Sequence, residues 1–79
     1  MPVFRVGGQE VSVDRRTVEQ AMEGKTPGRI TVHVVEVNGT VWPLKQVLAE
    51  ATGLDLLAFT TQEARRVLTR LGFRAFRTS

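Results

Sequence analysis

Hydrophobic side chains alternate with polar ones in two stretches of the chain, and each stretch is interrupted by a pair of turn-forming residues. A Gly-Gly pair at 7–8 divides residues 3–13, and an Asn-Gly pair at 38–39 divides residues 30–42. A period of two is typical of half-buried strands, and both pairs suit the positive φ angles of a two-residue turn. The pattern therefore predicts two β-hairpins.

Three other stretches repeat their apolar residues at intervals of three and four, which is the spacing of one buried helix face. They predict helices at 14–23, 43–52 and 61–71. Asp14 is a good N-cap for the first helix, and Thr60 with Glu63 has the spacing of a capping box at the third. Pro43 suits the first position of the second helix, where its missing N–H costs nothing.

The predicted order of elements is ββαββαα(β), in which a short strand follows the last helix. We expect an α+β fold in which both hairpins join one small antiparallel sheet covered by the helices. The 79 residues, 42% of them hydrophobic, are expected to form a single domain over 1–79. There is no cysteine, no run long enough to span a bilayer and no signal-peptide segment. These features predict a cytoplasmic protein without a membrane partner.

Side chains that could perform catalysis are sparse. The chain has no Cys or Tyr, one histidine (His33) within a predicted strand, and Ser12 and Ser79 as its serines. A nucleophile, a base and an orienting group cannot be assembled from this set, and the glycines lack phosphate-loop spacing. We therefore expect no enzyme activity, no catalytic residue, no metal, no cofactor and no small-molecule substrate. His33 is interpreted as an ordinary strand residue.

Positive charge is concentrated towards the C-terminal end of the chain. The net charge is +3, yet residues 1–59 carry six basic residues against seven acids, while residues 60–79 carry five arginines against Glu63 alone. Arginine suits phosphate and guanine recognition because its guanidinium is a planar fork of donors. A GC-rich genome would also raise the arginine content, although it would not explain the asymmetry.

The last predicted helix carries the candidate binding surface. With Ala64 turned to the core, a step of 100° per residue places the polar side chains on an outward arc. Arg and Gln read guanine and adenine edges, and Thr and Arg also bond phosphates. The predicted nucleic-acid-binding residues are Lys45, Gln62, Arg65, Arg66, Thr69, Arg70, Arg74 and Arg77. An ordinary solvated helix face is the alternative. The connection over residues 52–60 is longer than the turn of about 3–4 residues in a helix-turn-helix motif, so the match to that motif is poor.

Lys45 has no obvious structural reason to stand where it does. It would be the third residue of its helix, where a cation opposes the helix dipole at a cost of about 0.3–1 kcal/mol. It could contact a phosphate, pair with Glu50 or Asp55, or point into water. The single tryptophan, Trp42, is interpreted as a core anchor, because single-strand binders usually expose several aromatic residues.

The stretch VNGTVWPLKQVLAEATGL…FTTQEARRVLTRLGF, roughly residues 36–73, resembles a small domain of bacterial proteins. That domain stands at the N-terminus of some modification-dependent HNH restriction endonucleases and also occurs as stand-alone uncharacterised proteins of GC-rich bacteria. Pro43, Lys45, Gly72 and Phe73 carry the resemblance. In such endonucleases the cleavage residues lie in a separate HNH domain, which this sequence lacks. The resemblance implies a DNA-associated accessory module rather than a nuclease.

Two functions follow from these patterns. The first is a non-catalytic protein or module that binds nucleic acid through the basic C-terminal helix. Double-stranded DNA is the expected ligand. The second is a protein-interaction module or homodimer with no nucleic-acid role, because the N-terminal hairpin could leave an apolar edge for pairing with a second copy.

Overall fold

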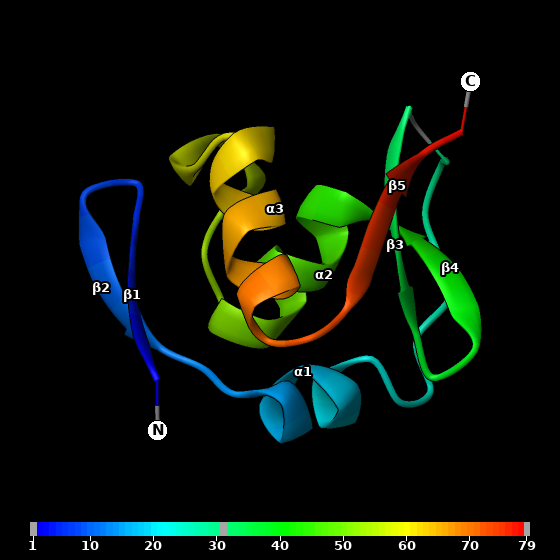
Figure 1. Cartoon of the computed structure of the whole chain (residues 1–79), viewed down its shortest axis with the longest axis horizontal. Coiled ribbons are helices and arrows are strands. Elements are labelled where there is room, and N and C mark those ends of the chain that lie inside the picture. Colours follow the sequence, from blue (N-terminus) through cyan, green and yellow to red (C-terminus); the bar gives the residue numbers. More distant parts are fainter. Residues whose placement is uncertain (1, 31, 79) are drawn as a thin grey trace.

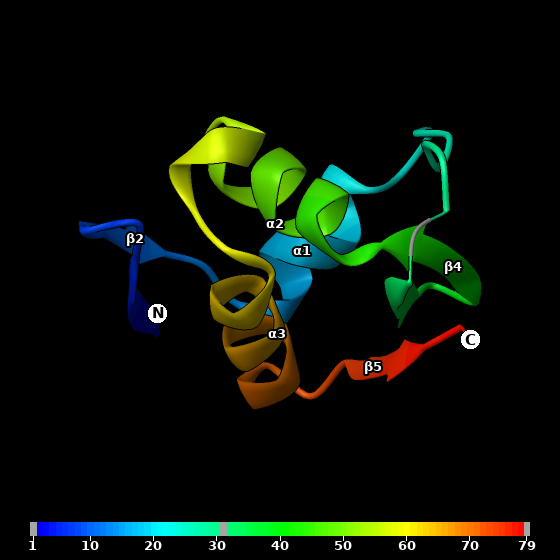
Figure 2. The same cartoon turned by 90° about the horizontal axis from the view of Figure 1, so that it is seen from above.

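The computed structural model describes residues 2–30 and 32–78, and in them three α-helices lie between a β-hairpin and a three-stranded sheet (Figures 1 and 2). The elements are β1 (Val3–Val6), β2 (Gln9–Ser12), α1 (Arg15–Ala21), β3 (His33–Val37), β4 (Thr40–Pro43), α2 (Leu44–Thr52), the 3₁₀ helix η1 (Leu56–Ala58), α3 (Thr61–Arg70) and β5 (Arg74–Arg77). The predicted α+β class and the order of elements are confirmed, including the short last strand.

The two hairpins do not share one sheet, so this part of the prediction is wrong. Within the described residues, β1 pairs with β2 alone, whereas β3 lies between β4 and β5 in a second antiparallel sheet. The edge of β3 that the first hairpin would have needed is taken by β5, with Ala75 opposite Val35. The first hairpin packs against α3 instead, and the helices separate it from the sheet (Figure 1).

The second hairpin is shorter than predicted, because β3 begins at His33 rather than at residue 30. The predicted alternation placed Ile30 and Val32 on one face with Val34, yet they are 48% and 41% exposed whereas Val34 is fully buried. The predicted strand position 31 lies outside the described residues. Val34 and the next residue, Val35, are both fully buried, so both faces of the sheet are covered at this point and the simple alternation fails.

The core lies between the helices and the inner face of the sheet. Trp42 is 3% exposed and its indole Nε1 donates to the carbonyl oxygen of Val37 at 3.4 Å, which confirms its interpretation as a core anchor. The helices contribute the apolar faces predicted for them. Their fully or nearly fully buried side chains are Val18 of α1 with Met22 at its C-cap, Leu44, Val47 and Leu48 of α2, and Ala64, Val67 and Leu68 of α3.

The helix ends agree closely with the signals in the sequence. Asp14 is the N-cap of α1, and the capping box of Thr60 and Glu63 opens α3. Gly72 follows α3 with a φ of 94°, and the N–H of Phe73 bonds back into the last turn of α3 at 3.0 Å. Phe73 is 6% exposed, so it packs back onto the helix as the apolar residue of a Schellman turn. α1 ends at Ala21, two residues before the predicted boundary at 23.

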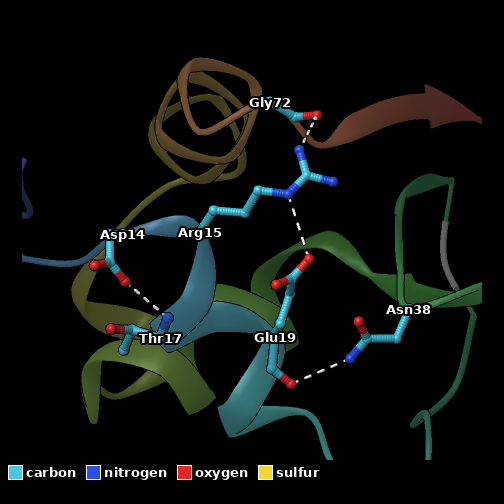
Figure 3. Close-up of polar contacts among 6 residues, drawn as sticks. All are labelled: Asp14, Arg15, Thr17, Glu19, Asn38 and Gly72. Carbon is cyan, nitrogen blue, oxygen red and sulfur yellow. Dashed lines mark hydrogen bonds and ion pairs between the residues drawn. The ribbon is translucent and has the colours of Figure 1, made fainter.

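Helix α1 ties the C-terminal end of α3 to the turn of the second hairpin (Figure 3). The guanidinium of Arg15 donates to the carbonyl oxygen of Gly72 at 3.0 Å and lies 3.3 Å from the carboxylate of Glu19. The side-chain amide of Asn38 donates to the backbone carbonyl of Glu19 at 3.2 Å. Asn38 thus provides both the positive φ of the turn, 54°, and a contact that fixes the turn on α1.

Candidate nucleic-acid interface

Helix α3 has one buried face and one exposed polar face, as the helical spacing predicted. Ala64, Val67 and Leu68 are fully buried against the core. The polar side chains opposite them are exposed, and α3 and β5 lie on the same side of the molecule (Figures 1 and 2). The exposed predicted residues of this segment are Gln62, Arg65, Arg66, Thr69, Arg70, Arg74 and Arg77.

Arg66 has a structural partner that the sequence did not predict. Its guanidinium donates to the backbone carbonyl of Arg5 at 2.9 Å, from α3 to strand β1. In a two-residue hairpin the residues next to the turn form a hydrogen-bonded pair, so Arg5, one residue further away, points its backbone groups out of the sheet. Arg66 therefore covers part of the free edge of β1.

Glu63 fixes the tip of the same hairpin. One carboxylate oxygen accepts the N–H of Gly7 at 3.0 Å, and the other accepts the N–H of Thr60 at 2.9 Å. These two hydrogen bonds, of which the one from Gly7 has the larger effect, hold the pKa of Glu63 below its ordinary value. Glu63 is thus occupied by the hairpin and the helix cap, and together with Arg66 it forms what we call the hairpin–helix contact.

The two arginines of β5 lie on opposite faces of the sheet, because successive side chains of a strand alternate. Arg74 is placed opposite Glu36 of β3, and its guanidinium lies 5.8 Å from the ring centroid of Phe76. Arg77 is placed opposite His33. The acid opposite Arg74 offsets part of its charge, so the two arginines do not continue the surface of α3 as one uniform strip.

Lys45 is partly buried and lies near the start of α3 rather than on its exposed face. Pro43 belongs to β4 and is the N-cap of α2, so Lys45 is the second residue of the helix and not the third. Its ammonium nitrogen lies 5.2 Å from the ring centroid of Phe59, within cation–π range.

Neither acid proposed as a partner for this lysine is used in that way. Glu50 pairs with Lys25 at 3.2 Å, and Asp55 accepts the N–H of Leu57 to cap η1.

Ion pairs are absent from the basic C-terminal segment as far as the structure describes it. Over residues 2–30 and 32–78 there are two ion pairs, Arg15 with Glu19 in α1 and Lys25 with Glu50. The arginines of α3 and β5 take part in neither, so no carboxylate within ion-pair distance neutralises them. Arg65 and Arg70 in particular are exposed, and their side chains form no hydrogen bond, ion pair or cation–π contact within the described residues.

Two cations outside the predicted set also belong to the picture. Arg5 adds an exposed side chain near Arg66, and Arg29 lines the same pocket as Lys45 at the starting end of α3. No sequence signal marks either residue, because both depend on contacts between segments far apart in the chain. The described residues bring together no group of three or more His, Cys, Asp or Glu side chains that could hold a metal ion.

Comparison with known proteins places most of the chain in one family. A family model described as SCO5918-like matches residues 9–79. No curated protein and no solved structure matches the chain. In the part of the chain that the structure describes, no helix combines the length and the apolar character needed to cross a membrane.

Proposed function

The chain belongs to the SCO5918-like family, and we propose that it is a small non-catalytic protein that binds nucleic acid, double-stranded DNA first, through the exposed face of α3. The observation that carries this proposal is the absence of acidic partners for its arginines: Arg65, Arg66 and Arg70 are exposed on one helix and take no part in the ion pairs of the described residues. A helix with a purely structural role gains nothing from like charges four residues apart, which are mildly destabilising.

The composition of this face suits both parts of nucleic-acid recognition. Arg65 and Gln62 are of the residue types that form paired hydrogen bonds to guanine and adenine, and Thr69 is of a type that bonds phosphate oxygens. Arg66 is held in place by β1, so a phosphate contact from it would cost little side-chain entropy. Arg74 and Arg77 would contribute to long-range attraction, and Lys45 is a weaker candidate for a phosphate contact because of its position beside Phe59.

The resemblance to N-terminal domains of HNH restriction endonucleases supports the same proposal. Such a module would work beside DNA in the bacterial cytoplasm and leave cleavage to another domain. The family match extends over residues 9–79, well beyond the 36–73 in which the resemblance is concentrated.

A gel-shift titration of the full chain on duplex and single-stranded DNA at two salt concentrations tests the proposal. Affinity should fall with salt by about 0.9 log units per log unit of salt for each phosphate contacted. Arg65→Gln removes one cation, so it should reduce the steepness of this slope by about 0.9 log units per log unit of salt, the value for one phosphate contact. Arg16→Gln is the matched control, because it removes the same charge from an exposed position on α1. Absence of binding at ~50 mM salt, or equal effects of the two variants, would contradict binding through α3.

Self-association is the second candidate, and the separate first hairpin favours it. Since β1 and β2 form a sheet of their own, β2 keeps a free edge in the described structure, and Val3 is 58% exposed on β1. Arg66 covers the carbonyl of Arg5 on the other edge, so pairing through β2 is the remaining route. Light scattering at ~100 μM, well above a micromolar dissociation constant, would contradict this candidate if it gave the mass of a monomer.

A further inference from the structure

A pocket of about 630 Å³ lies where the starting ends of α2 and α3 approach the loop before β3. This size falls within the range of roughly 300–1,000 Å³ that is usual for small-molecule sites. Its lining is mainly apolar and includes Val32, Pro43, Leu44 and Leu56. Val32 is 41% and Leu56 49% exposed, so two large apolar side chains remain uncovered beside the pocket.

The loop that forms one wall of the pocket is fixed to α2 by its own contacts. The side-chain carbonyl of Gln46 accepts the N–H of Gly28 at 2.7 Å, and its NH₂ group donates to the carbonyl of Thr26 at 3.2 Å. One turn further along α2, Glu50 pairs with Lys25 at the start of the same loop at 3.2 Å. The wall is therefore in place before any ligand arrives, which lowers the ordering cost of binding.

The charge of the pocket has one sign. Arg29 and Lys45 both line it, and the described residues of the lining include no Asp or Glu. The ammonium group of Lys45 lies against Phe59 and forms no ion pair within the described chain, so it can receive an anionic group from a ligand. Two cations beside an apolar surface, with no acid to neutralise them, are complementary to a molecule that carries both an anion and an apolar body.

We propose that this pocket binds a small organic carboxylate with an apolar body. Lys45 and Arg29 hold the carboxylate, and the apolar body covers Val32 and Leu56. A phosphodiester of nucleic acid would satisfy the cations but would leave the apolar lining exposed to water. The pocket is thus a second site, distinct from the exposed face of α3.

The test uses the isotopically labelled full chain and two probes of matched shape, 4-phenylbutyrate and its neutral amide, 4-phenylbutyramide. Titration with the acid should shift the backbone amide signals of Gly28, Val32, Gln46 and Thr61 in a saturable way. The amide should bind about fivefold more weakly, because it cannot make the charge-assisted contacts. This comparison needs no variant and holds whether or not a substitution disturbs the fold.

Two variants then assign the contacts. Lys45→Met keeps the apolar stem and removes the charge, and Arg29→Gln keeps a polar side chain; each should weaken binding of the acid by about fivefold. Arg16→Gln on α1 is the control and should change it less than about twofold. The proposal is overturned by the absence of saturable shifts up to ~10 mM acid, by equal binding of acid and amide, or by an equal effect of the Arg16 variant.

Discussion

Gly7 and Gly8 form a matched pair for testing how firmly the first hairpin is held against the rest of the molecule. Both have positive φ angles, 58° and 78°. An alanine at either position would therefore adopt a left-handed conformation that costs about 1–2 kcal/mol. At Gly7 an added Cβ would overlap the backbone carbonyl oxygen of Ala58, whereas at Gly8 it would meet no atom within 4 Å. The difference between the two alanine variants therefore isolates the packing of the turn.

The expected difference can be worked out from these contacts. Gly8→Ala should cost about 1 kcal/mol, because the left-handed penalty is partly offset by the lower entropy of the unfolded chain. Gly7→Ala carries the same cost and must also move the hairpin away from Ala58, since a backbone oxygen cannot rotate aside. Such overpacking costs about 1–3 kcal/mol. The movement would also lengthen the 3.0 Å bond from the Gly7 N–H to Glu63. We expect a difference of about 2 kcal/mol, or about 8–16 °C in Tm.

Urea unfolding followed by the fluorescence of Trp42 and by circular dichroism measures this difference. Trp42 is the chain's single tryptophan and is 3% exposed, so its signal reports loss of the core. Hydrogen exchange at the amide of Gly7 separates local release of the hairpin from global unfolding. The packing of the turn against Ala58 would be refuted if the free energies of unfolding of the two variants agreed within about 0.5 kcal/mol and exchange at this amide were unchanged.

Three further substitutions test the core and the electrostatics. Leu48→Ala, at a fully buried position of α2, should lower the free energy of unfolding by about 2–5 kcal/mol. Leu57→Ala, at a position 93% exposed, should change it by less than about 0.5 kcal/mol in the same urea experiment. Because folding lowers the pKa of Glu63, its carboxylate stabilises the protein at neutral pH, and this contribution is lost as pH falls below 4.5 towards the folded-state pKa. Urea midpoints should therefore fall less steeply between pH 7 and 3 in Glu63→Gln than in the wild type. Some fall should remain, because the pKa of Asp14 is also lowered in the folded state. Equal falls in the two proteins would contradict the assignment to Glu63.

Features set by neighbouring residues were predictable from the sequence. The cap at Asp14, the capping box of Thr60 and Glu63, and the return of Phe73 after Gly72 each depend on residues within one or two turns. Such interactions are written in short spacings, and the chain forms them wherever the rest of the fold allows. The exposed face of α3 follows for the same reason, because it depends on helical period alone.

Features set by distant partners were not predictable. The prediction of one sheet failed because β5 competes for the edge of β3, and no local pattern compares the two possible partners. The partner of Arg66 is a backbone carbonyl, at Arg5, and every residue offers such a group. Lys45 is the second residue of α2 and not the third, because Pro43 ends strand β4 and caps α2 instead of being its first residue. The pocket likewise depends on a long-range contact, in which the side chain of Gln46 accepts the N–H of Gly28, 18 residues earlier in the chain.

The pairing of β3 with β5 has a consequence for the order in which the protein folds. The β3–β4 hairpin closes through a two-residue turn, a step of microseconds, whereas Val35 and Ala75 stand far apart in the sequence, so their pairing closes a much longer loop and is the slower step. Until then one edge of β3 is open and can pair with another unfinished molecule. Arg74 and Arg77 border the short apolar pair at 75–76, so the strand that arrives last has a charged residue at each end. Charges in this position oppose aggregation of the partly folded chain, and an arginine retained for that reason would be needed even in the absence of any ligand.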